Sequence, residues 1–150
     1  MKVTYVSAIG VTTEAVADKE IIMTKLIYLA SPYSDPDENV RKRRFEEICE
    51  VSGALMSAGN FVFCPIAHTH PIAVLTSLPT GFDYWEEYDT RLIVACDELW
   101  VCTMDGWDSS IGVTSEIKIA NANGKPTFMV SPDDPLNPVL YRFMEDGDDS

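Results

Sequence analysis

The segment Asp105-Gly-Trp-Asp-Ser-Ser-Ile-Gly-Val-Thr-Ser-Glu116 combines the residue types of an anion site with a carboxylate. It follows an apolar run at 98–104, which predicts a strand, a polar loop and then a helix. The unpaired N–H groups and positive dipole of a helix N-terminus suit a phosphate. Glu116 falls just inside this helix, beside whatever the loop binds. A carboxylate next to a phosphate site indicates chemistry on a phosphorylated small molecule.

Further polar side chains gather where the predicted strands end. These strand-end residues are Tyr28, Ser31, Tyr33, Ser34, His68, His70, Asp105, Asp108, Ser109 and Ser110. With Glu116, Asp89 gives a pair of carboxylates that we expect to face one crevice. Paired carboxylates beside a tyrosine suit glycosidic bond cleavage, because one attacks or stabilises the anomeric carbon and the other manages the leaving group's proton. The alternatives are that Glu116 only complements the helix dipole and that Ser110 is only an N-cap.

The elements that must position these residues alternate along the chain. Strands are predicted at 25–31, 61–64, 98–103 and 127–130, and helices at 36–58, 82–96, 110–122 and 135–144. Residues 65–81 contain Pro, Thr, Ser, Gly and two His, and they predict a long loop with at most one helical turn. The alternation predicts a three-layer, flavodoxin-like α/β fold, with a parallel sheet of four to five strands and helices on both faces. In such sheets the ligand binds at the carboxyl ends of the strands.

Length and charge limit the organisation and the partners. The 150 residues fit one domain at 25–144, with an N-terminal arm or extra edge strand at 1–24 and an acidic tail at 145–150. The formal net charge of −13 disfavours binding of DNA or RNA, although a mononucleotide needs only a few local donors. No apolar run approaches the ~20 residues that span a bilayer. The N-terminal segment lacks the apolar stretch of a signal peptide, so we expect a cytoplasmic protein without membrane contact.

The sequence gives little support for a metal or a cofactor. Cys49, Cys64, Cys96 and Cys102 lie in apolar runs without a C-x-x-C pair, which predicts reduced, buried thiols. Cys64, His68 and His70 are of metal-ligand type and close together in the sequence, but no further ligand follows at zinc spacing. We therefore expect base or sugar contacts, or plain loop roles, for the two histidines. The chain has no Walker loop and no G-x-G-x-x-G motif for a nucleoside triphosphate or a dinucleotide.

Two further patterns have competing interpretations. Arg41-Lys-Arg-Arg44 holds four of the eleven positive charges, and it is either a solvated helix face or a source of charge for a phosphate. Trp85 is large enough to stack on a base, but its helical spacing with Tyr88 and Leu92 favours a place in the core.

Several short motifs occur in an order that resembles the nucleoside 2-deoxyribosyltransferase superfamily over residues 25–130. The motifs are Tyr28-Leu-Ala-Ser-Pro32, Tyr88-Asp89, Ala95-Cys-Asp97, Ser110-Ile-Gly-Val-Thr-Ser-Glu116 and Gly124-Lys-Pro126. The resemblance implies that Glu116 is the nucleophile on the anomeric carbon, that Asp89 handles the base or the sugar, and that Tyr28 lies near the nucleophile. It also implies that no cofactor is needed and that the protein is a homodimer or a larger homo-oligomer.

Ser110 stands six residues before Glu116, where the nucleoside transferases of this superfamily carry an aspartate that meets the 5′-hydroxyl. The members that hydrolyse deoxynucleoside 5′-monophosphates carry a serine there. Physical chemistry agrees, because a carboxylate repels a 5′-phosphate whereas a hydroxyl at a helix N-terminus donates to it. The first loop, Ser31-Pro-Tyr-Ser-Asp35, lacks the arginine of those hydrolases, so the charge would come from Arg41 or Arg44.

The resemblance therefore implies hydrolysis of a (deoxy)nucleoside 5′-monophosphate to free base and (deoxy)ribose 5-phosphate. The expected substrate and phosphate contacts are Ser31, Ser34, His68, Asp108, Ser109 and Ser110. The alternatives are a nucleoside 2-deoxyribosyltransferase and a non-catalytic nucleotide-binding module.

Overall fold

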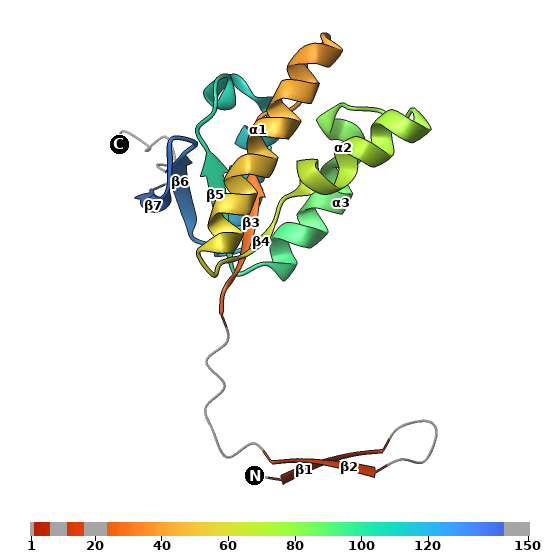
Figure 1. Ribbon diagram of the computed structural model, residues 1–150, viewed down its shortest axis with the longest axis vertical. Helices are drawn as coiled ribbons and strands as arrows, with labels where there is room; N and C mark the ends of the chain where they lie inside the picture. The colour runs from red at the N-terminus through yellow and green to blue at the C-terminus, as the bar shows by residue number, and fades with distance from the viewer. Residues whose placement is uncertain (1, 7–11, 17–23, 143–150) are drawn as a thin grey trace, which may run out of the picture.

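A computed structural model gives the fold of the chain and describes residues 2–6, 12–16 and 24–142. Its main sheet has the strand order β4-β3-β5-β6-β7 (Figure 1). The strands are β3 (Leu26–Ala30), β4 (Phe61–Phe63), β5 (Glu98–Cys102), β6 (Thr127–Ser131) and β7 (Asp134–Tyr141). The first four in this order are parallel, and β7 runs antiparallel to β6.

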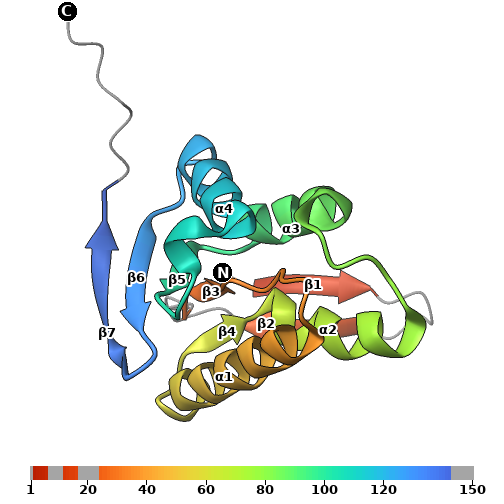
Figure 2. The same ribbon diagram turned by 90° about the horizontal axis from the view of Figure 1, so that it is seen from above.

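In the part of the chain that the structure describes, four helices cover the two faces of this sheet. They are α1 (Glu38–Ser57), α2 (Pro65–Thr76), α3 (Phe82–Ala95) and α4 (Ile111–Ala122). Figure 2 shows α1 and α2 on one face and α3 and α4 on the other. A short 3₁₀ turn, η1 (Trp107–Ser109), precedes α4. The prediction of a three-layer, flavodoxin-like α/β fold is confirmed.

Strand β3 shows how the sheet divides the core. Successive side chains of a strand point to opposite faces, and all residues from Ile27 to Ala30 are buried. Ile27 and Leu29 pack into the cluster that contains the α1 residue Ile48. Tyr28 packs on the other side, with residues of α3 and α4. The alternation therefore directs Tyr28 toward the helices that carry the two candidate carboxylates.

The prediction of a long loop at 65–81 is wrong, because helix α2 occupies 65–76. Pro65 begins the helix, where its missing N–H would have no partner in any case. Pro71 lies inside the helix, where it removes the N–H that would bond one turn earlier and its ring crowds the carbonyl of residue 67. Thr69 and Ala73 are buried at helical spacing. Tertiary packing thus stabilises a helix whose composition is typical of a loop.

The prediction of a final helix at 135–144 is also wrong. Residues 134–141 form β7, which pairs with β6 so that Tyr141 lies opposite Thr127. Pro135 and Pro138 disfavour a helix, and proline is tolerated in a strand at the edge of a sheet. Residues 143–150, which include the predicted acidic tail at 145–150, lie outside the described residues.

The described parts of the N-terminal segment form a sheet of their own. Strand β1 (Lys2–Val6) pairs antiparallel with β2 (Thr12–Val16). The order of the five-stranded sheet contains neither strand.

Two findings concern the helices and the thiols. Within the described residues, no helix is both long enough and apolar enough to cross a membrane. All four cysteines are free; Cys64, Cys96 and Cys102 are buried, and Cys49 is half-buried.

Candidate active site

A cavity of about 380 Å³ lies where β3, β4 and β5 end. Its lining comes from the loop after β3, from α2, from α3 and the connection before it, and from α4 with the loop that leads into it. Strands β3 and β5 are neighbours, and their connections lead to helices on opposite faces of the sheet. Such a point is where open α/β sheets bind ligands.

Glu116 lies in this cavity with its carboxylate in a hydrogen bond from Tyr28. The Tyr28 hydroxyl donates to Glu116 Oε1 at 2.7 Å. Tyr28 is fully buried, and Glu116 is 5% exposed. Burial raises the pKa of Glu116 to about 8, although the Tyr28 hydrogen bond opposes this shift. Burial also raises the pKa of Tyr28 well above its ordinary value, so the phenol keeps its proton and remains a donor.

Asp89 supplies a second buried carboxyl from α3. It lines the cavity and is 8% exposed. Burial raises the pKa of Asp89 to about 7, and the charge of Asp89 contributes to the raised pKa of Glu116. The two carboxyls are therefore close enough to influence each other's protonation. An arrangement of this kind is typical of acid–base sites.

The predicted core face of α3 is wrong. Within α3 the buried residues are Asp89 and Ile93, whereas Tyr88 is exposed. Trp85 is half-buried at the cavity, and its indole N–H donates to the Pro79 carbonyl at 2.9 Å. The inward face of α3 therefore combines Asp89, which lines the cavity, with Ile93, which packs into the apolar core one turn later.

Ser31 is the clearest sign that this cavity takes a polar ligand. Its hydroxyl is buried at the cavity and has no hydrogen-bond partner among the described residues. An unsatisfied buried hydroxyl is costly, so such groups usually have a partner. A bound ligand would supply that partner.

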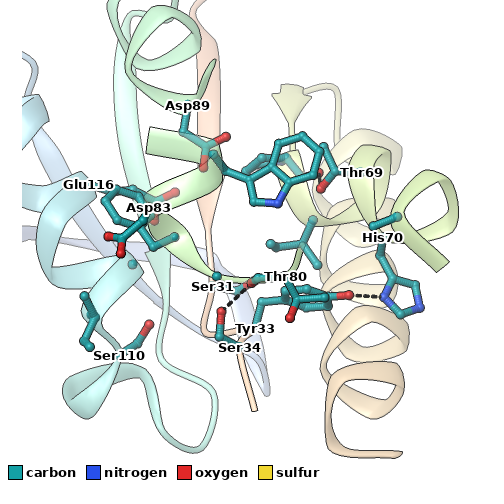
Figure 3. Close-up of a pocket in the computed structure, with 18 of the residues that line it drawn as sticks. Ser31, Tyr33, Ser34, Thr69, His70, Thr80, Asp83, Asp89, Ser110 and Glu116 are labelled. Carbon is teal, nitrogen blue, oxygen red and sulfur yellow. Dashed lines mark hydrogen bonds between the residues drawn. The ribbon is translucent and has the colours of Figure 1, made fainter. Parts of the chain in front are cut away.

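The loop before α4 brings two more predicted contacts to the cavity. Ser110 caps α4 by accepting the Val113 N–H at 3.2 Å. Ser109 also lines the cavity, and its hydroxyl donates to the Gly106 carbonyl at 3.3 Å. Capping occupies one lone pair of Ser110 and leaves its hydroxyl proton available to a ligand. Figure 3 shows Ser110, Asp89 and Glu116 on one side of the cavity, with Thr69 and His70 on the opposite side.

The loop after β3 lies between these two sides. Ser34 lines the cavity, but its hydroxyl donates to the Thr80 carbonyl at 2.7 Å, which ties this loop to the α2–α3 connection (Figure 3). Tyr33 shares a 2.6 Å hydrogen bond with His70 Nδ1. Burial, followed by the charge of Arg41, lowers the pKa of His70.

Two predicted contacts do not reach this cavity. His68 is exposed and lies beside Phe63, with ring centroids 6.1 Å apart. Asp108 borders a separate cavity of about 210 Å³ between α4 and Tyr141. Thr69 and Phe82 do line the main cavity, and sequence reasoning missed them because their segment was expected to be a loop or its border.

The basic motif 41–44 is neither simply solvated nor part of the cavity lining. Lys42 and Arg43 are exposed. Arg41 and Arg44 instead donate to backbone carbonyls of the loop after β3. Among the described side chains, no three His, Cys, Asp or Glu residues are grouped as metal ligands.

A comparison with models of protein families gives a match. The model of the family described as a domain of unknown function, DUF1937, matches residues 25–132. This range includes every strand of the sheet except β7 and the whole lining of the main cavity. A comparison with curated proteins found no match. Because the matched range covers most of the chain, the protein belongs to the DUF1937 family.

Proposed function

We propose that this protein is an N-glycosidase that hydrolyses a (deoxy)nucleoside 5′-monophosphate through a glutamate nucleophile, Glu116. The observation that carries the proposal is the buried Tyr28–Glu116 hydrogen bond of 2.7 Å, in a cavity that also contains the N-terminus of α4. Asp89 adds the second carboxyl that glycosidic cleavage requires. The motifs shared with nucleoside 2-deoxyribosyltransferases support the same assignment.

The cavity offers a distinct environment to each part of a nucleotide. The phosphate would bind at the start of α4, where Ser110 and the free hydroxyl of Ser31 are available. The anomeric carbon would then lie against Glu116. The base would extend toward Trp85 and Thr69, where an indole ring and an apolar wall allow stacking.

The reaction proceeds in two steps in this proposal. The Glu116 carboxylate attacks C1′, the N-glycosidic bond breaks, and its electron pair leaves with the base, which takes a proton from Asp89. Water then attacks C1′ of the glycosyl ester and gives a proton to the Asp89 carboxylate, and Glu116 is released. The raised pKa of Asp89, about 7, supports its role as the acid of the first step.

The motif resemblance supports three further parts of the proposal. The enzyme would need no cofactor, would act in the cytoplasm on a small nucleotide rather than on a nucleic acid polymer, and would form a homodimer or a larger homo-oligomer.

A panel of ribo- and deoxyribonucleoside 5′-monophosphates, together with the corresponding nucleosides, tests the assignment. We expect free base from at least one monophosphate, detected by chromatography, and little or none from the nucleosides. Adding a second free base separates the alternatives, because a new nucleoside formed from an unphosphorylated donor would indicate a transferase. Saturable nucleotide binding without base release would instead indicate a binding module.

The pH dependence of kcat/KM is expected to be bell-shaped, with both limbs between about pH 7 and pH 8. The reactive form needs ionised Glu116 and protonated Asp89, although the pKa of Glu116, about 8, lies above that of Asp89, about 7. This form is therefore a minority of the enzyme at every pH, and its population is largest midway between the two pKa values and falls on either side. Initial rates of base release from pH 5 to 10 measure the profile. Asp89→Asn should remove the alkaline limb. A flat profile from pH 5 to 9 would contradict the assigned roles of both carboxyls.

A further inference from the structure

We propose that Arg44 is a positioning residue, which holds together the loop after β3 and the loop after β5 at the phosphate end of the cavity. The proposal rests on the proposed function only where it names phosphate as the ligand. It assigns a role to Arg44, a residue of the basic motif 41–44 that neither lines the cavity nor simply faces solvent.

The first contact of Arg44 is with the loop after β3. Its Nη1 donates to the carbonyl oxygens of Tyr33 at 3.3 Å and Ser34 at 3.0 Å. Arg41, one helical turn earlier, donates to the next carbonyl, that of Asp35. Three consecutive carbonyls therefore face the guanidinium groups of α1.

These hydrogen bonds fix the orientation of the peptide groups in the loop after β3. In a trans peptide the C=O of one residue and the N–H of the next point in opposite directions. The N–H groups of Ser34 and Asp35 therefore point away from Arg44. The side chains of Ser31, Tyr33 and Ser34 line the cavity from the same short loop.

The second contact of Arg44 is with the loop after β5. Gly106 in this loop has φ +89°, and a Cβ atom at this position would lie 2.7 Å from Arg44 Nη2. The guanidinium thus lies directly against the Gly106 backbone, in space that only glycine leaves open. The Gly106 carbonyl also accepts a hydrogen bond from the Ser109 hydroxyl, and the next residue, Ser110, caps α4. One side chain therefore contacts both loops that carry the proposed phosphate ligands.

An arginine suits this position because its planar fork presents several donors in fixed directions. A lysine keeps the charge, but its single ammonium group cannot reproduce the contacts with both loops. The position of Arg44, rather than its charge alone, is therefore expected to matter.

The test compares Arg44→Gln and Arg44→Lys with the matched control Lys42→Gln. Lys42 lies on the same helix, is exposed, and makes only a 3.9 Å ion pair with Glu46. We expect both Arg44 variants to bind 2-deoxyribose 5-phosphate about tenfold more weakly than the wild type in calorimetric titration, with Lys42→Gln nearly unchanged. Wild-type affinity in Arg44→Lys would show that charge alone suffices and would overturn the proposal.

Hydrogen exchange supplies a readout that does not depend on catalysis or on the ligand. In Arg44→Gln, amides of residues 33–35 and of 105–110 should both exchange faster, while those of β3 stay protected. In Gly106→Ala the diagnostic signal is faster exchange at residues 33–35, because the new Cβ would displace the guanidinium, whereas strain at φ +89° by itself disturbs residues 105–110. Unchanged exchange in either loop overturns the proposal. If the wild type does not bind the sugar phosphate, the proposed phosphate site is wrong, and exchange still decides the role of Arg44.

Discussion

Replacing Glu116 with glutamine is expected to lower base release at least about 10³-fold and to stabilise the fold at alkaline pH. The amide oxygen still accepts the hydrogen bond from Tyr28, so the local packing is kept. An amide does not act as a nucleophile at C1′, which removes the first step of the reaction. It also carries no charge that must be buried.

The sign of the stability change follows from the pKa of Glu116. This pKa is about 8 in the folded protein and 4.5 in the reference state, so the folded state holds the extra proton between these values. Stability contributed by this group is therefore complete below pH 4.5 and falls as the pH rises through 8. Glu116→Gln cannot lose stability in this way. Its free energy of unfolding should therefore exceed that of the wild type by roughly 2–4 kcal/mol above pH 8 and by almost nothing at pH 4.5.

Urea unfolding at pH 4.5 and pH 8.5, together with the base-release assay, measures both effects. Glu50→Gln is the matched control, because Glu50 is exposed on α1 and away from the cavity lining. The control should change neither activity nor the pH dependence of stability. Retained base release in Glu116→Gln would exclude this residue as the nucleophile. Equal stability gains at both pH values would show that Glu116 is not the buried group that ionises.

Replacing Ser110 with aspartate is expected to reverse the preference of the site. Aspartate is among the best N-cap residues and can accept the Val113 N–H as Ser110 does, so α4 should remain intact. Its carboxylate would, however, face the 5′-phosphate at the helix N-terminus. Two negative charges about 4 Å apart near a protein surface repel each other by a few kcal/mol. We therefore expect KM for the monophosphate to rise about 10²-fold. Unphosphorylated nucleosides should be cleaved as well as before, or better.

Ser110→Asn separates charge from shape. Asparagine caps a helix as well as aspartate does but is neutral, so it should retain most of the activity on the monophosphate. Steady-state kinetics with a monophosphate and its nucleoside give the comparison. Equal losses in the two variants would show that size rather than charge matters at this position. An unaffected Ser110→Asp would place the phosphate elsewhere in the cavity.

The sequence predicts the part of this site that depends on regular local patterns. Tyr28 lies in a short apolar run, ended by a proline, that predicts a buried strand, and Ser110 and Glu116 lie in a helix with a clear cap. Parallel strands place their carboxyl ends at one edge of the sheet. Because Ser31 follows one parallel strand and α4 follows its neighbour, this topology brings both to the same cavity.

The remaining part depends on tertiary packing that no local pattern records. Helix α2 forms in a proline-containing segment because Thr69 and Ala73 are buried. The rotation of α3 places Asp89 inward, although the spacing of Trp85 and Tyr88 favours another face. The contact of Arg44 with Gly106 joins loops that are distant in the sequence. Such contacts become visible only in three dimensions.

Because Tyr28 lies in β3, its position depends on the stability of the whole sheet. This strand is hydrogen-bonded to neighbours on both sides, and its residues from Ile27 to Ala30 are buried on both faces. Core strands of this kind open only when the entire domain unfolds. Fluctuations of the surrounding loops can therefore admit and release small molecules without disturbing Tyr28, which we propose orients the nucleophile. We expect base release, if the proposed function holds, to be lost on heating only at the temperature at which the sheet itself melts.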